Sequence, residues 1–222
     1  MPFADRSQAG KQLAAALFLY RTQRPVVLAL PRGGVPVAAE VAAALNAPLD
    51  LVLVRKVGVP FQPELAMGAV AEGEVPLIVR NEDVVQAAGI DDATFKSVCD
   101  DELAEIERRR QRYLRGRRRA KVANRTVIVV DDGIATGATT RAALRATRLR
   151  KPKKLVLAVP VAPTESLVAM REDADEVICL EAYEAFGAIG DYYSDFRQVS
   201  DEEVIEQLGR FETDIEKRAQ PA

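Results

Sequence analysis

Short apolar runs alternate with helical stretches along most of the chain. The runs are continuously apolar rather than alternating, which is typical of strands buried on both faces of a parallel sheet. They lie at 26–30, 51–54, 126–130, 155–159 and 176–180, and helical periodicity occupies 35–45, 138–149 and 166–171. This strand–helix alternation predicts an α/β fold with a doubly wound, mostly parallel sheet that carries helices on both faces.

Some segments depart from the alternation. Residues 66–79 resemble a short antiparallel excursion, and residues from about 91 to 121 form a highly charged inserted helical arm. Asp5 is placed to start a helix near the N-terminus, and residues 201–217 show the pattern of a closing amphipathic helix. Because no low-complexity linker separates these parts, we expect one domain over residues 1–222.

Composition and charge indicate a globular protein. Hydrophobic residues make up 48% and charged residues 29% of the chain, and the net charge of -2 gives no general attraction to nucleic acid or anionic membrane. The two cysteines, Cys99 and Cys179, lie outside any CxxC spacing, so neither a zinc site nor a disulfide framework is expected. No apolar run reaches membrane-spanning length, and we expect a cytoplasmic protein.

The chain contains no histidine. This excludes Ser-His-Asp and Cys-His nucleophilic systems, histidine-ligated metals and histidine general bases. The remaining chemistry consists of carboxylates, Arg and Lys, hydroxyls, backbone dipoles and hard cations held by oxygen. These groups suit phosphate chemistry better than acyl transfer.

The most informative motif follows the strand predicted at 126–130. Asp131 and Asp132 come directly after this strand, and a stretch of small residues then leads through Gly137 into a helix. Ligands of open parallel sheets bind at this edge, and a helix N-terminus offers free N–H groups and a positive dipole. The pattern predicts a phosphate-binding loop beside two carboxylates that can accept hydrogen bonds from sugar hydroxyls. The alternative is an ordinary strand-to-helix turn in which Asp132 only caps the helix.

This run resembles the phosphoribosyl pyrophosphate signature of type I phosphoribosyltransferases, with four apolar residues, two acids, a small-residue stretch and Thr-Gly. Other segments agree, in family order. Residues 31–34 (Pro-Arg-Gly-Gly) resemble the diphosphate-binding loop, where we expect a cis peptide bond at Arg32–Gly33. Residues 57–67 correspond to the mobile loop that closes over the reaction, and residues 187–197 resemble the hood of hypoxanthine-guanine type enzymes. That hood occupies about 181–199 here.

The resemblance implies a role for each motif. Asp131 and Asp132 would fix the ribose. The 5-phosphate would lie on the loop formed by Ala135, Thr136, Gly137, Ala138 and Thr139. The diphosphate would be bound by Arg32, Gly33, Arg55, Lys56 and Arg197, and by Mg2+ held with the help of Asp191.

The base and its chemistry are less well defined by these residues. Tyr183 or Phe186 would form one face of a slot for a planar base, and Glu64 is the best candidate for a general base. Ala135 and Pro160 stand where the 6-oxopurine enzymes carry base-contacting aspartate and lysine side chains. These residues therefore do not identify the acceptor base.

We expect a phosphoribosyltransferase that moves ribose-5-phosphate from phosphoribosyl pyrophosphate to a small nitrogenous base and releases diphosphate. The alternative is a non-catalytic regulator that binds phosphoribosyl pyrophosphate on the same fold. Homodimers are common in similar families, and no membrane partner is expected. Residues 108–121 contain nine Arg and Lys residues, but acidic residues lie just upstream. We therefore expect a solvated helix end or an oligomer contact there, rather than a nucleic-acid-binding arm.

Overall fold

The computed structural model describes residues 2–73, 75–114 and 116–211, which form a large parallel sheet and a small antiparallel one. The large sheet has the strand order β2-β1-β6-β7-β8, and every neighbouring pair is parallel. Its strands are β1 (Val26–Ala29), β2 (Leu49–Leu51), β6 (Thr126–Val130), β7 (Lys154–Pro163) and β8 (Glu176–Tyr183).

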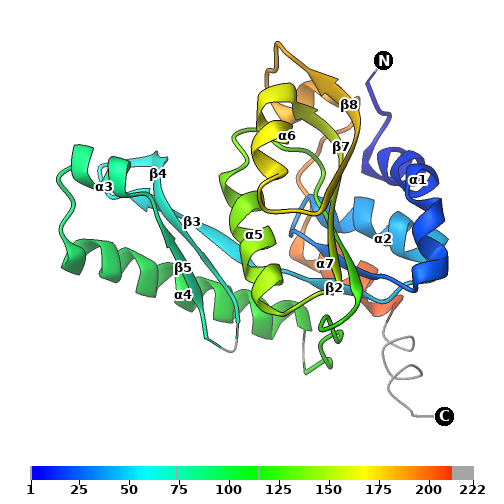
Figure 1. Cartoon of the computed structure of the whole chain (residues 1–222), viewed down its shortest axis with the longest axis horizontal. Helices are drawn as coiled ribbons and strands as arrows, with labels where there is room; N and C mark the ends of the chain where they lie inside the picture. Colours follow the sequence, from blue (N-terminus) through cyan, green and yellow to red (C-terminus); the bar gives the residue numbers. More distant parts are fainter. Residues whose placement is uncertain (1, 74, 115, 212–222) are drawn as a thin grey trace.

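Helices cover both faces of the large sheet (Figure 1). One face carries α1 (Arg6–Ala16), α2 (Gly34–Leu45) and α7 (Asp201–Gly209), and the other carries α5 (Ala138–Leu149) and α6 (Thr164–Met170). Alternate residues of β6 enter the two cores: Ile128 packs with α1 and α2, whereas Val129 packs with α5. Every residue of β6 is buried, which explains its continuously apolar sequence. The predicted α/β fold with a doubly wound parallel sheet is confirmed.

The small sheet belongs to an arm that extends away from the large sheet (Figure 1). It consists of β3 (Val54–Val59), β4 (Gln62–Ala71) and β5 (Leu77–Arg80), which pair antiparallel in that order. The long helix α4 (Asp92–Leu114) packs against it, and the short helix α3 (Glu82–Ala87) connects the two. Phe95, Cys99 and Ile106 of α4 share a core with Val57 and Met67 of the sheet.

Two predicted elements differ from the structure. The strand expected at 51–54 is wrong, because the chain leaves the large sheet after Leu51 and enters the small one at Val54. Its apolar run is nevertheless buried, since Val52 and Leu53 lie in the two different cores. The segment 57–67, expected as a loop, forms the β3–β4 hairpin.

The ends of the described chain contain two shorter features. Asp5 caps α1 by accepting a hydrogen bond from the Gln8 N–H at 2.7 Å, as predicted. The closing helix begins at Asp201, as predicted, but residues 212–217 of that prediction lie outside the described residues.

Short 3-10 turns occur at Phe18–Gln23 and at Ile189–Tyr192. Among the described residues, no helix is long and apolar enough to cross a membrane.

The position of β1, between β2 and β6 inside the large sheet, gives a direct test of the two-core arrangement. Leu28 is fully buried, so Leu28→Ala leaves a cavity and should lower the free energy of unfolding by about 2–5 kcal/mol. Leu19→Ala is the matched control, because Leu19 is 83% exposed and its loss should cost less than about 0.5 kcal/mol. Urea denaturation measures both, and similar losses in the two variants would contradict the arrangement.

Candidate active site

The carboxyl ends of β1 and β6 bring two of the predicted motifs into contact. Ala29 pairs with Val130, and the Leu30 N–H donates to the Val130 carbonyl oxygen at 2.9 Å. The loop that follows β1 then passes over the carboxylates that follow β6. A Cβ atom at Gly33 would lie 2.0 Å from Asp132 Oδ2, so only glycine fits there. The loop of residues 31–34 and the two aspartates therefore form one site.

The cis peptide bond of this loop lies one position earlier than predicted. It joins Pro31 to Arg32, not Arg32 to Gly33. Gly33, the N-cap residue of α2, already has helical backbone angles, with φ of -60° and ψ of -35°. The expectation of a cis bond in this loop was correct, but its position was wrong.

The two aspartates have different environments. Asp132 is buried, and its Oδ2 accepts a hydrogen bond from Arg6 Nε at 2.8 Å. The Tyr193 hydroxyl donates to the Asp132 carbonyl oxygen at 2.5 Å. Asp131 Oδ1 accepts the N–H of Asp132 at 2.9 Å, and no cation of the described chain forms an ion pair with it. Asp132 is thus compensated by a cation, whereas Asp131 is not.

This difference appears in the proton affinities. Burial raises the pKa of Asp131 well above its usual range, and the neighbouring Asp132 carboxylate raises it further. Burial also raises the pKa of Asp132, but there the Arg6 guanidinium acts in the opposite direction. Asp131 is therefore the carboxylate that gains most from a ligand able to donate hydrogen bonds.

The predicted phosphate loop combines fixed ends with an exposed middle. Ile134 N–H donates to the Val161 carbonyl at 3.0 Å, and Ser166 Oγ donates to the Ala135 carbonyl at 2.8 Å. Thr136 is exposed, and Gly137 has a left-handed φ of 77° that suits glycine. No side chain of the described residues caps the N-terminus of α5, so its first N–H groups remain available to an anion.

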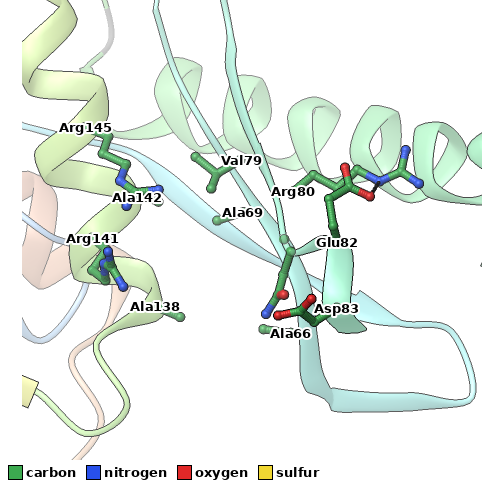
Figure 2. Close-up of a pocket in the computed structure, with 12 residues that line it drawn as sticks. Ala66, Ala69, Val79, Arg80, Glu82, Asp83, Ala138, Arg141, Ala142 and Arg145 are labelled. Atoms are coloured by element: carbon green, nitrogen blue, oxygen red, sulfur yellow. Dashed lines mark ion pairs between the residues drawn. The ribbon is translucent and has the colours of Figure 1, made fainter. Parts of the chain in front are cut away.

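A pocket of about 390 Å³ opens beside the start of α5 (Figure 2). Ala138, Arg141 and Arg145 form its wall on α5, and residues of β4, β5 and α3 form the opposite wall, among them Ala66 and Asp83. Arg141 Nε and Arg145 Nε both contact the Asp173 carboxylate, at 3.0 and 2.8 Å. Since Ala138 belongs to the predicted phosphate loop, this pocket borders the place expected for the 5-phosphate.

The cations predicted to bind diphosphate all carry acidic partners within the chain. In the part of the chain that the structure describes, none of them forms an ion pair with Asp131 or Asp132. The partners are Asp201 for Arg32 (3.4 Å), Glu102 for Arg55 (2.6 Å), Glu64 for Lys56 (3.0 Å) and Glu203 for Arg197 (2.7 Å). The Glu64 side chain is 95% exposed on the hairpin.

The aromatic residues of the predicted hood pack on one another. Tyr192 lies between Tyr183 and Phe186, with ring centroids 4.6 and 4.8 Å away. Each of these two rings therefore has one face against Tyr192 rather than against an open slot. Asp191 Oδ2 accepts the Ala188 N–H at 2.8 Å and so stabilises the turn at the start of the segment.

The acidic residues differ in their fit to magnesium. Within the described ranges, no group of three or more Cys, Asp and Glu residues could hold a metal. Magnesium, however, is usually held by only one or two carboxylates together with water and substrate phosphates. Asp191, which is exposed and has one oxygen engaged by a backbone N–H, meets that requirement, so the donors fit a cation that binds together with a phosphorylated ligand.

The arginine-rich tract at the end of α4 is largely paired. Glu105 accepts from Arg108 and Arg109, which lowers its pKa to about 2. Arg110 pairs with Glu107, Arg112 with Asp201 and Glu202, and Arg119 with Glu72. These contacts agree with the expectation of a solvated helix end better than with a nucleic-acid-binding arm.

One residue of the site, Arg6, was missed by our prediction from the sequence. Arg6 reaches Asp132 across 126 positions of sequence. A cation in the first turn of a helix is disfavoured by the helix dipole, and that anomaly could have marked Arg6 as a residue with a partner elsewhere.

Comparisons with known proteins agree on one family. A family model described as "Phosphoribosyl transferase domain" matches residues 5–197. A "putative phosphoribosyl transferase" is present in each of the Mycobacterium tuberculosis strains H37Rv and CDC 1551. Each is 48% identical over 213 residues, which cover 96% of this chain and 48% of the relative. The chain thus spans about half the length of these curated relatives.

A solved structure is similar over nearly its whole length. The crystal structure of TT1426 from Thermus thermophilus is 42% identical in sequence and superposes with a TM-score of 0.82. The match covers 95% of this chain and 99% of that chain.

Separate replacement of the two carboxylates tests their different environments. Asp131→Asn removes a charge that burial disfavours, so we expect the free energy of unfolding near neutral pH to stay equal or rise. Asp132→Asn leaves the Arg6 guanidinium without its buried partner and should cost about 3 kcal/mol. Chemical denaturation of both variants beside the wild type measures the difference.

The pH dependence of the free energy of unfolding independently checks whether the Asp131 charge destabilises the fold. A pKa that is higher in the folded than in the unfolded chain makes the Asp131 contribution to stability fall as the pH rises above about 4. The advantage of Asp131→Asn over the wild type should therefore grow with pH. Equal stability losses in the two variants, or an advantage that shrinks at higher pH, would contradict this description of the site.

Proposed function

Because this chain belongs to the phosphoribosyl transferase domain family, we propose that it binds phosphoribosyl pyrophosphate and transfers ribose-5-phosphate to a small nitrogenous base. One observation carries the proposal: a buried strand ends in two carboxylates beside an uncapped helix N-terminus, and a glycine loop packs directly on the carboxylates. Sugar hydroxyls and a phosphate are the ligand groups that such a site can satisfy together.

The sugar and its phosphate are held by β6 and α5. Asp131, whose carboxylate lacks a cation within the described chain, and Asp132, through the oxygen that Arg6 does not engage, accept hydrogen bonds from the vicinal ribose hydroxyls. The 5-phosphate lies on the backbone N–H groups of residues 135–139, where the dipole of α5 adds a favourable potential. Fixing the ribose at both ends orients its anomeric carbon for the reaction.

Transfer breaks the bond between the anomeric carbon and the diphosphate oxygen, and forms a bond from the same carbon to a base nitrogen. The ring oxygen stabilises positive charge on the carbon as diphosphate leaves, so the task of the protein is to stabilise the departing negative charge. The backbone at Gly33 packs on the Asp132 carboxylate, and Gly33 and the adjoining Arg32 contact the diphosphate. Arg55, Lys56 and Arg197 join it by exchanging their present carboxylate partners for phosphate oxygens.

Asp191 would help to hold magnesium, which would supply a hard positive charge to offset the negative charge of the diphosphate. In this proposal Asp191 of the hood segment contributes to the magnesium site, and Tyr183 or Phe186 covers one face of the acceptor base. For the latter role, one of these rings has to separate from Tyr192.

A regulatory function is the second candidate, and one observation favours it. All four cations expected at the diphosphate already pair with carboxylates of this chain. A protein that only senses phosphoribosyl pyrophosphate needs the ribose and 5-phosphate contacts, and it can leave these ion pairs in place.

The remaining expectations are compatible with either function. We propose that residues 1–222 act as one domain in the cytoplasm, where a reducing environment suits the two free cysteines Cys99 and Cys179. A homodimer remains part of the proposal, and the protein's oligomeric state in solution would test it.

Turnover separates the two candidate functions. We expect one member of a nucleobase panel to stimulate magnesium-dependent diphosphate release from phosphoribosyl pyrophosphate. Asp131→Asn should lower that release by at least about 100-fold, because the ribose loses its orienting carboxylate. Lys11→Ala, an exposed change on α1, is the control and should release diphosphate as the wild type does. Tight binding of phosphoribosyl pyrophosphate without release for any base would establish the regulator instead.

The role of Glu64 is tested by a conservative replacement. As the general base, Glu64 removes the proton from the attacking nitrogen, so Glu64→Gln should lower kcat by about 100-fold or more. The KM for phosphoribosyl pyrophosphate should not rise, since this carboxylate does not hold the sugar and its loss frees Lys56 for the diphosphate. Glu206→Gln, an exposed change on α7, provides the matched control in steady-state kinetics. An unchanged kcat in Glu64→Gln would remove the residue from the mechanism.

A further inference from the structure

Arg6 occupies a position that its own helix does not favour. It is the first residue of α1, where the positive end of the helix dipole repels a cation. Its side chain is nevertheless only 11% exposed. Contacts outside the helix must therefore account for its placement.

These contacts reach two separate segments of the site. Arg6 Nε donates to Asp132 Oδ2 at 2.8 Å, and Arg6 Nη1 donates to the Arg197 carbonyl oxygen at 2.8 Å. The guanidinium carbon also lies 3.9 Å from the centre of the Phe196 ring. A planar guanidinium with several donors can make these three contacts at once, which a lysine ammonium cannot reproduce.

Backbone hydrogen bonds strengthen the same connection. The chain just before α1 pairs with the hood: the Ser194 N–H donates to the Phe3 carbonyl at 2.8 Å, and the Asp195 N–H donates to the Ala4 carbonyl at 2.9 Å. The Tyr193 hydroxyl then reaches the Asp132 carbonyl. The N-terminal segment and the hood thus both contact Asp132, on which Gly33 also packs.

We propose that Arg6 is a positioning residue of the sugar-phosphate site, which fixes the Asp132 carboxylate and fastens the hood to the end of β6. Arg6 engages Oδ2 and leaves Oδ1 of the same carboxylate to accept a ligand hydroxyl. The inference rests on the proposed function for the ligand, but the link between Arg6, Asp132 and the hood stands on the contacts alone.

Two Arg6 variants and a control separate positioning from general stabilisation. Arg6→Gln removes the charge, Arg6→Lys keeps the charge without the planar fork, and Lys11→Ala changes an exposed cation of the same helix. Affinity for phosphoribosyl pyrophosphate, measured by calorimetry with magnesium, should fall by about tenfold or more in Arg6→Gln and by less in Arg6→Lys. Lys11→Ala should bind as the wild type does. Circular dichroism and Tm identify any variant that is not folded at the temperature of the titration.

A double-mutant cycle tests whether Arg6 acts through Asp132. Arg6→Gln should weaken binding much less in an Asp132→Asn background than in the wild type, because residues that act through one contact are not additive. An affinity within about twofold of the wild type in Arg6→Gln, or fully additive effects in the cycle, would overturn the inference.

Two further measurements decide the inference even if the wild type binds no phosphoribosyl pyrophosphate, a result that would refute the proposed function. The first is the same cycle for the free energy of unfolding, which should also be non-additive. The second is amide hydrogen exchange at Ser194 and Asp195, which should accelerate in Arg6→Gln but not in Lys11→Ala. Additive stabilities with unchanged exchange would overturn the inference.

Discussion

Two adjacent carboxylates at the carboxyl end of a buried strand impose the main constraint on this structure. A buried charge is costly unless it is paired or hydrogen-bonded. Asp132 is compensated by Arg6, which belongs to the first helix of the chain, and its backbone is held by Tyr193 near the other end. Asp131 has no cation within the described residues and depends on the Asp132 N–H. The two carboxylates are therefore held only when distant segments meet at β6, and Asp131 keeps no cation partner among the described residues.

The doubly wound sheet makes this meeting possible. Parallel pairing aligns the carboxyl ends of β1 and β6, so the loop after β1 necessarily passes close to the aspartates after β6. The helices on the two faces have different tasks: α5 presents its free N-terminus to the site, whereas α1 brings the compensating cation. The arm of β3, β4, β5 and α4 shares a continuous core with α1 and α2, and it borders the pocket beside Ala138.

Local patterns predicted local structure well and long-range pairing poorly. The bounds of β6 and α5 match the prediction, because a doubly buried strand and a glycine turn leave clear signals in neighbouring residues. The strand expected at 51–54 failed because a buried apolar run does not tell which of two sheets it joins. The ion-pair partners of the predicted cations could not be predicted from the sequence either. Arg55, for example, meets Glu102 only because α4 packs on the small sheet. The sequence therefore indicated two motifs that the structure brings into contact, the loop of residues 31–34 and the aspartates after β6, but not the ion pairs around them.

Calorimetric titration of the wild-type protein with phosphoribosyl pyrophosphate, with and without magnesium, tests the central claim most directly. We predict binding in about the micromolar range that requires magnesium, because the two aspartates repel a diphosphate and the cations expected there are already paired with carboxylates. Binding under neither condition would contradict the account, and it would leave the loop after β6 to serve another phosphorylated ligand.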